Sequence, residues 1–298
     1  MKRNLEKGLF ILLLSISFLT GCKKSFEKPD ITPSATASAL LHDSTFTAVN
    51  TTQNPYPITP VQECIYSPYY GDSIVYPQPS SGDYYVYPQN TNGLKGTYFS
   101  WPAGLVLNSN TGAIDLTLSQ TGQRYDMAFV QYGTTDTCIS PLIVAGTSYM
   151  DSIYSLAQSD TSSDPYFNGN PYAPNPCWNK KGPGACQFDY NNFAKVQGVI
   201  VNRQTGFIDI QNTARNIFGK FPFNGESVYS TIYYKVNDAT KNAPQQIQIK
   251  LMYYNRRSDV PASILSTISN NVTSTLNNQL LSKGPSPRPP LILIVRNN

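Results

Sequence analysis

The stretch that decides the fold occurs twice in this chain: Gly104-Leu-Val-Leu-Asn-Ser-Asn-Thr-Gly-Ala-Ile-Asp-Leu116 and Gly198-Val-Ile-Val-Asn-Arg-Gln-Thr-Gly-Phe-Ile-Asp-Ile210. Of its thirteen positions, six are identical in the two copies and four more exchange one aliphatic residue for another. The copies begin 94 residues apart, a spacing that suits one β-sandwich domain and is too long for a solenoid unit. The repeat therefore predicts two tandem copies of one fold.

Each copy of the repeat predicts a β-hairpin. The side chains of Asn108 and Asn202 can accept hydrogen bonds from the backbone that follows them and so open a turn. Gly112 and Gly206 can adopt the positive φ that closes it. Because the residues after the turn alternate between aliphatic and polar, one face of each hairpin is expected to lie in a core.

The repeat also carries one acidic position, Asp115 in the first copy and Asp209 in the second. These two residues are the best acidic candidates for a functional role, either in binding calcium or in catalysis. The favoured interpretation is structural: an outward-facing Asp that stabilises the hairpin through hydrogen bonds to the backbone.

Outside the repeat, from about residue 59 onward, short runs of β-branched and aromatic residues alternate with clusters of Gly, Pro, Asn and Asp. Such spacing is typical of an all-β sandwich. We predict a mostly β protein of two tandem Ig/cadherin-like β-sandwich domains, the first over residues 59–160 and the second over residues 161–298.

The second predicted domain has the clearest elements. Alternating residues indicate strands over 227–236 and 245–254, and Pro261 opens a helix predicted over 262–283. The apolar run that begins at Leu291 predicts a final strand over 290–296. This strand needs a partner: it either completes the second sandwich or adds to the edge of another subunit.

The first 21 residues predict a secretory signal peptide, with a basic start and an apolar run too short for an ordinary membrane span. The run ends in Leu19-Thr-Gly-Cys22, which resembles the lipobox of bacterial lipoproteins. That resemblance implies that Cys22 is lipidated and that its acyl chains anchor the mature chain to a membrane. Residues 22–58, rich in Ser, Thr, Ala and Pro, predict a flexible tether.

The first copy of the repeat resembles a known group of domains. The run Trp101-Pro-Ala-Gly-Leu-Val-Leu-Asn-Ser-Asn-Thr-Gly-Ala-Ile, followed by Ser119, Gly122 and Tyr125, is similar to Ig-like and cadherin-like domains of bacterial surface proteins. The whole layout resembles surface lipoproteins of the Bacteroidota type. The resemblance implies seven-stranded sandwiches that act as spacers or as adhesion and interaction modules without catalysis. The acidic motifs with which true cadherins bind calcium are absent, so no calcium role is carried over.

Charge and location follow from the composition and the N-terminus. Charged residues make up only 13% of the 298 residues, and the net charge is +4. Because nucleic-acid-binding proteins concentrate Lys and Arg on one face, we expect no nucleic-acid partner. The expected location is the outer membrane, where the lipid-anchored chain faces either the periplasm or the cell exterior.

Four cysteines follow Cys22, an even number that favours two disulfides in an oxidising compartment. Of the three possible pairings, we favour Cys177 with Cys186 and Cys64 with Cys138. A zinc site is the alternative, but the sequence has no Cys-x-x-Cys pair and its only histidine, His42, lies in the predicted tether. We therefore expect no metal and no cofactor.

Tyrosine is unusually frequent, with 21 residues. Exposed Tyr84 and Tyr85, together with Trp101 or Trp178, could stack on sugar rings or anchor a protein partner. The alternative interpretation is that these tyrosines are structural, since tyrosine is a strand former that suits half-buried sheet surfaces.

We expect no enzyme activity. A Ser-His or Cys-His pair needs a well-placed base, and a glycosidase needs two carboxylates with separated roles; no such arrangement is evident. The sequence favours a non-catalytic envelope lipoprotein that acts as a structural or interaction module of the adhesion type. The alternative is a carbohydrate-binding accessory of a polysaccharide-uptake system, and a glycan hydrolase is the least favoured function.

Overall fold

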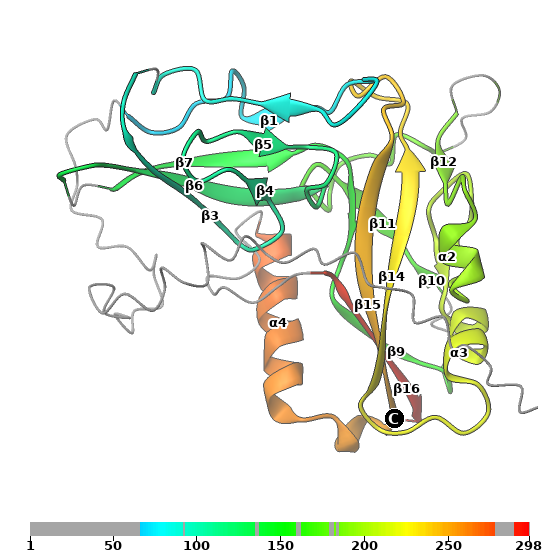
Figure 1. Cartoon of the computed structure of the whole chain (residues 1–298). Coiled ribbons are helices and arrows are strands. Elements are labelled where there is room, and N and C mark those ends of the chain that lie inside the picture. Colours follow the sequence, from blue (N-terminus) through cyan, green and yellow to red (C-terminus); the bar gives the residue numbers. More distant parts are fainter. Residues whose placement is uncertain are drawn as a thin grey trace, which may run out of the picture. The chain divides into compact units, whose positions relative to one another are not determined.

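The computed structural model describes residues 66–277 and 289–297, except for residues 92, 135–136, 159–161, 179–181 and 183–184. The predicted signal peptide, Cys22 and the predicted tether lie outside the described residues. Within them the protein is mostly β, as predicted, with three α-helices that include a single long one near the C-terminus (Figure 1).

The first half of the described chain is an Ig-like sandwich of two sheets. The larger sheet has the strand order β1 (Ile74–Val75), β7 (Thr137–Val144), β6 (Gln123–Gln131) and β3 (Gly96–Trp101). The smaller sheet has the order β2 (Tyr85–Val86), β5 (Ile114–Asp115) and β4 (Val106–Leu107). Strand β1 pairs in parallel with β7, and every other pairing in the two sheets is antiparallel.

The two sheets enclose one apolar core, to which strands β5, β6 and β7 contribute every second residue. The hairpin of the first repeat copy, β4 and β5, supplies the inner wall of the smaller sheet. The buried members of this core are Tyr70, Val75, Leu105, Ile114, Leu116, Tyr125, Met127, Leu142 and Val144. The sequence repeat therefore does mark a sandwich hairpin in its first copy.

The second half is built on a five-stranded sheet with the order β12 (Gln187–Phe188), β14 (Glu226–Lys235), β15 (Gln245–Arg256), β16 (Leu291–Asn297) and β9 (Ser152–Ser155). Strand β14 is antiparallel to both of its neighbours, β12 and β15, whereas β16 is parallel to both of its neighbours. The long hairpin of β14 and β15 agrees with the strands predicted from the alternating residues.

Strand β16 is the predicted final strand, and it lies inside the sheet between β15 and β9. Its residues Ile292 to Val295 are fully buried, which explains the uninterrupted apolar run, because an internal parallel strand is covered on both faces. The alternative of edge addition to another subunit is wrong for this strand, since both neighbours come from its own chain.

The layers that cover this sheet distinguish the second half from the first. One face is covered by α2 (Phe193–Val196), α3 (Ile210–Phe218) and two short ladders, β8 (Thr147–Tyr149) with β11 (Pro165–Phe167) and β10 (Ser162–Ser163) with β13 (Ile208–Asp209). The other face is covered by α4 (Ala262–Leu276), which follows the exposed turn η1 (Arg257–Asp259). Figure 1 shows α4 on one side of the sheet and α2 and α3 on the other. The expected second copy of the sandwich is thus replaced by one sheet between mixed layers.

The cause of this difference lies directly after the repeat. In the first copy, Asp115 begins a single turn, closed by the Ser119 amide bonding to the Asp115 carbonyl, and Gly122 follows at a φ of 67°. In the second copy, Asp209 caps a helix that continues to Phe218. No glycine interrupts the residues that follow, and the next one, Gly219, ends the helix.

The boundary between the halves also differs from the expected one. Strand β9, placed in the first domain by the predicted boundary at residue 160, pairs with β16 at the edge of the second sheet. The sandwich ends at Val144 with β7. The long helix begins as predicted after Pro261, and its described part ends at Leu276; residues 278–288 lie outside the described residues.

Candidate functional site

The second copy of the repeat forms a tight hairpin turn. The Asn202 Oδ1 accepts hydrogen bonds from the Gln204 and Thr205 amides at 3.0 and 3.1 Å, and the Gly206 amide donates to the Asn202 carbonyl at 2.9 Å. Asn108 makes the same three contacts in the first copy. The turn predicted for both copies is therefore confirmed.

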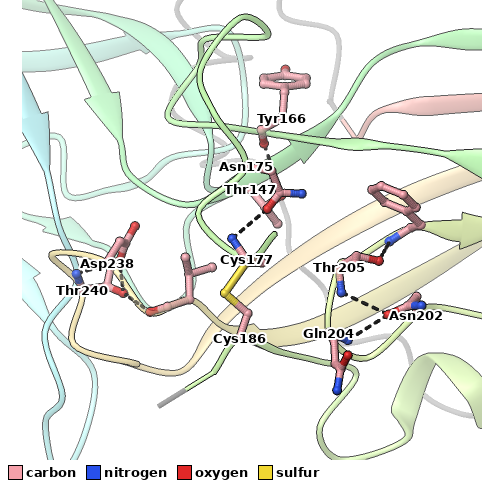
Figure 2. The surroundings of a disulfide bond; sticks show 12 residues. Thr147, Tyr166, Asn175, Cys177, Cys186, Asn202, Gln204, Thr205, Asp238 and Thr240 are labelled. Carbon is pink, nitrogen blue, oxygen red and sulfur yellow. Dashed lines mark hydrogen bonds between the residues drawn. A yellow bond between two sulfur atoms is a disulfide. The ribbon is translucent and has the colours of Figure 1, made fainter. Parts of the chain in front are cut away.

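A disulfide between Cys177 and Cys186 lies close to this turn, as Figure 2 shows. Both cysteines are buried, and the Cys177 amide donates to the Asn175 Oδ1 at 2.8 Å. The predicted pairing is confirmed. Cys138 is also disulfide-bonded, but Cys64 lies outside the described residues, so that pairing stays a prediction.

The disulfide loop and the repeat turn together present an aromatic pair at the surface. Trp178 directly follows Cys177 and is 56% exposed. Its ring centroid lies 6.1 Å from that of Phe207, with the planes tilted by 39°. Phe207 follows Gly206 in the turn. We call these two residues the aromatic pair.

Phe207 also lines a surface pocket of about 520 Å³, which we call the polar pocket. Its apolar wall consists of Ile200, Val201 and Phe207, and its polar groups come from Ser162, Asn202, Asp209 and Gln211. A ligand in this pocket would meet an aromatic ring together with amide, hydroxyl and carboxylate groups.

The Asp209 carboxylate in this pocket is already engaged. Its Oδ1 accepts from the Asn212 amide at 2.9 Å and its Oδ2 from the Asn212 side chain at 2.6 Å. Asp209 is thus the N-cap of α3, a position that stabilises a helix start. Its contacts agree with the structural interpretation of the recurring aspartate.

The recurring aspartate of the first copy also bonds to the backbone, but it does not point outward. Asp115 is only 3% exposed, and its Oδ1 accepts from the Thr117 and Leu118 amides at 2.9 and 3.2 Å. Burial raises the pKa of this carboxyl, while the two amide bonds act in the opposite direction. The expectation of an outward-facing Asp115 was therefore wrong in orientation and right in its bonding.

The four aromatic residues predicted as a ligand-binding set do not form one site. Tyr84 packs against the sandwich core, whereas Tyr85 is 48% exposed on β2, where the Asp115 charge raises the pKa of its phenol. Trp101 lies on β3 in the other sheet, with its ring centroid 6.1 Å from that of Phe99. Trp178 belongs to the second half.

Two residues of the site, Phe207 and Gln211, escaped the sequence analysis. Phe207 had a signal: it is the one aromatic residue in the repeat, where the first copy has Ala113. Gln211 had none, because its place in the pocket depends on the helix that begins after the second copy.

Two further features of the described residues concern metal binding and membrane spans. No group of three or more His, Cys, Asp and Glu side chains there could hold a metal ion. None of the helices in that part of the chain has the length and apolar character needed to cross a membrane.

No protein-family model matches this sequence, and no curated protein matches it. Solved structures with similarity include the EC1-2 fragment of human protocadherin-24, at 6% identity and a TM-score of 0.20 over 60% of this chain and 93% of that one. A SusE-like surface-located polysaccharide-binding protein from Bacteroides thetaiotaomicron shares 9% identity, at a TM-score of 0.21 over 59% of this chain and 32% of that one. Extracellular domains 3–5 of Drosophila OTK share 10% identity, at a TM-score of 0.19 over 63% of this chain and 64% of that one. Likenesses at these TM-scores establish neither a shared function nor a common ligand.

Proposed function

We propose that this chain is a non-catalytic lipoprotein of the cell envelope that acts as an interaction module, and that it binds its partner at the aromatic pair. The observation that carries the proposal is that Trp178 is 56% exposed although its neighbour Cys177 is held by a disulfide. An exposed aromatic ring on a restrained backbone loses little conformational entropy on binding, and Trp is enriched among residues that dominate binding energy.

A saccharide is the ligand class favoured by a second observation, the polar pocket beside Phe207. A sugar ring offers an apolar face of C–H groups and a rim of hydroxyls, and it matches a site with an aromatic wall and a few amide groups. The Asn202 Oδ1 is used in the turn, and in the part of the chain that the structure describes its Nδ2 and the Gln211 side chain can meet hydroxyls. This is the carbohydrate-binding alternative of the sequence analysis.

The test uses the full chain in a non-ionic detergent and native electrophoresis through gels that contain one polysaccharide each. We expect retardation by at least one polysaccharide, lost in Trp178→Ala and reduced in Phe207→Ala. Tyr132→Ala is the matched control, because Tyr132 is also highly exposed but lies in the sandwich. Retardation that survives Trp178→Ala would refute this location of the site.

If no polysaccharide retards the chain, the carbohydrate candidate fails. Cross-linking in cells then tests the interaction module. A photo-reactive residue at position 178 should capture a protein partner, and the same probe at position 132 should not.

The exposed Tyr85 is retained as a separate candidate contact on the sandwich. Tyr84 packs against the core, so a double substitution would also disturb folding. Tyr85→Ala alone is therefore the informative variant in the same gels.

The membrane anchor is part of the proposal and has its own test. Several acyl chains on Cys22 would hold the chain to a membrane, because each buried methylene adds about 0.8 kcal/mol. Cells fed labelled palmitate should label the wild-type chain and not Cys22→Ser. An unlabelled wild-type chain would refute the lipid anchor and would not bear on the proposed binding site.

A further inference from the structure

A second pocket shares Gln211, near the start of α3, with the polar pocket. It has a volume of about 500 Å³, and Gln211 lines both pockets. Its apolar floor comes from Leu156, Ala214, Phe218 and Tyr253. Its rim carries three cationic side chains, Arg215, Lys220 and Arg296. We call it the basic pocket.

The three cations reach this rim from different parts of the chain. Arg215 lies in the last turn of α3, and Lys220 follows Gly219, which ends that helix. Arg296 comes from β16, on the face that also carries the buried Ile294, because side chains alternate along a strand. Their convergence is a consequence of the tertiary structure.

Among the described residues, no carboxylate lines the basic pocket. The hydrogen bonds of two of its cations within the described residues go to neutral groups: Arg215 donates to the Asn212 Oδ1 at 3.1 Å and Arg296 to the Lys220 carbonyl at 3.4 Å. Glu226, at the start of β14, accepts a hydrogen bond from the Phe223 amide, and Asp259 in η1 accepts one from the Asn224 side chain.

Three like charges around one cavity repel one another, and an anion in the cavity would offset this repulsion through its attraction to each cation. Arginine guanidinium groups bind carboxylate, sulfate and phosphate through paired N–H donors. The floor also contains the aromatic ring of Tyr253. Burial raises the pKa of the Tyr253 phenol, and the positive charge of the nearby Arg296 opposes that rise. The cavity therefore suits an anionic group attached to a ring-shaped body.

We propose that the basic pocket binds the carboxylate or sulfate group of an acidic saccharide whose neighbouring sugar unit lies in the polar pocket. This inference rests on the carbohydrate candidate above and names its substrate class. Gln211, which lines both pockets, provides the continuity between them, so one chain of sugar units can span both. Phe221 and Phe223, which are 82% and 79% exposed, follow Lys220 and offer further apolar contact.

The test compares an acidic and a neutral oligosaccharide of equal length, oligogalacturonate and a malto-oligosaccharide, by calorimetric titration of the full chain. We expect the acidic ligand to bind about 10-fold more tightly or better at low salt. This preference should vanish at about 1 M salt, where the Debye length is about 3 Å. Inorganic sulfate should compete with the acidic ligand and not with the neutral one.

Two triple variants distinguish an effect of the basic pocket from an effect of the protein's net charge. Arg215→Ala with Lys220→Ala and Arg296→Ala should lose about 10-fold or more of the affinity for the acidic ligand, since charge-assisted bonds are the strong ones, and keep the affinity for the neutral one. Lys95→Ala with Lys195→Ala and Lys241→Ala removes the same charge elsewhere and should bind like the wild type. All six side chains are exposed, so folding is expected to survive, which thermal melts verify.

The outcomes distinguish the two proposals. Equal affinity for acidic and neutral ligands, or an equal loss in both triple variants, would overturn the acidic-saccharide inference and leave the carbohydrate candidate standing. Binding of neither ligand would also overturn the inference, whereas the carbohydrate candidate itself is decided by the polysaccharide gels. Binding to vesicles of anionic phospholipid without binding to oligogalacturonate would also overturn the inference, because the pocket would then serve a membrane surface.

Discussion

At the scale of single residues, one position of the repeat serves two different structural tasks. Asp115 is buried and closes a single turn, whereas Asp209 begins a helix. In both cases a carboxylate oxygen accepts from amides two or three residues ahead, a geometry that depends only on the local backbone. The same residue therefore recurs although the structures that follow it differ.

We expect Asp115→Ala to lower the free energy of unfolding by about 1 kcal/mol, the typical value of a capping side chain. Asp115→Asn keeps the accepting oxygen and should retain most of the stability. Urea denaturation at neutral pH checks both variants, and equal losses in the two would contradict a capping role.

The titration of Asp115 gives a further expectation. Its pKa is raised in the folded protein, so the folded state binds the proton more tightly than the unfolded state. The free energy of unfolding should then fall as the pH rises from the ordinary aspartate range through the raised value. In Asp115→Asn this dependence is removed, so the variant should gain stability relative to the wild type across that window. If the free energies of unfolding of the wild type and Asp115→Asn change in parallel with pH, the raised pKa of Asp115 is refuted.

At the scale of elements, the two hairpins share a close contact between glycine and an aromatic ring. A Cβ on Gly112 would lie 2.7 Å from the Tyr98 ring, and one on Gly206 would lie 2.7 Å from the Phe188 ring. Both glycines also have positive φ, 72° and 80°. The glycine is thus identical in the two copies for steric and conformational reasons at once.

Gly206→Ala should therefore cost about 2–5 kcal/mol, the sum of a left-handed backbone penalty and overpacking against Phe188. Gly133→Ala is the matched control: its φ is 83°, but nothing lies within 4 Å of its Cβ, so only about 1 kcal/mol should be lost. The midpoints of urea denaturation measure the difference, and similar midpoints would rule out the contact with Phe188.

The short disulfide loop is the second element with a measurable contribution. Closing a loop with a sequence separation of 9 residues stabilises the protein by about 2.7 kcal/mol in the chain-entropy model. Cys177→Ala with Cys186→Ala should lower the melting temperature accordingly and also weaken any binding that depends on Trp178. A double variant with unchanged melting and binding would show that the loop is held by its other contacts.

At the scale of the whole molecule, one hydroxyl joins the two halves. Tyr234 on β14 is fully buried. Its Oη accepts from the Thr147 amide at 2.9 Å, donates to the Gln245 Oε1 at 3.2 Å and contacts the Thr121 hydroxyl. Burial raises the pKa of this phenol well above its usual range. Thr121 precedes β6 of the sandwich and Thr147 begins the second half, so this network fixes the connection between them.

Tyr234→Phe should destabilise the protein by about 2 kcal/mol, because it leaves the buried Thr147 amide without its acceptor. Hydrogen exchange at Thr147 should accelerate more than exchange in the middle of β15. Tyr132→Phe, at a side chain that is 61% exposed, should change neither quantity. Unchanged exchange at Thr147 in Tyr234→Phe would refute the network.

Several features were determined by the sequence itself: the two hairpin turns, the Cys177–Cys186 disulfide, the β14–β15 hairpin and the start of the long helix after Pro261. Each depends on residues close together in the chain, such as the Asn202 side chain bonding to amides two and three residues ahead. Local interactions of this kind are encoded in short windows, so a pattern of residue types is enough to indicate them.

Only the tertiary structure decided the parallel pairing of β16 with β9, the helical layers of the second half and the composition of both pockets. These depend on residues far apart, as in the bond from the Asn271 side chain to Asp151, 120 positions away. The basic pocket is the clearest case, because Arg215 and Arg296 share a rim only once β16 has entered the sheet beneath α3. Packing between distant segments is set by which buried faces fit together, and no local pattern of residue types contains that information.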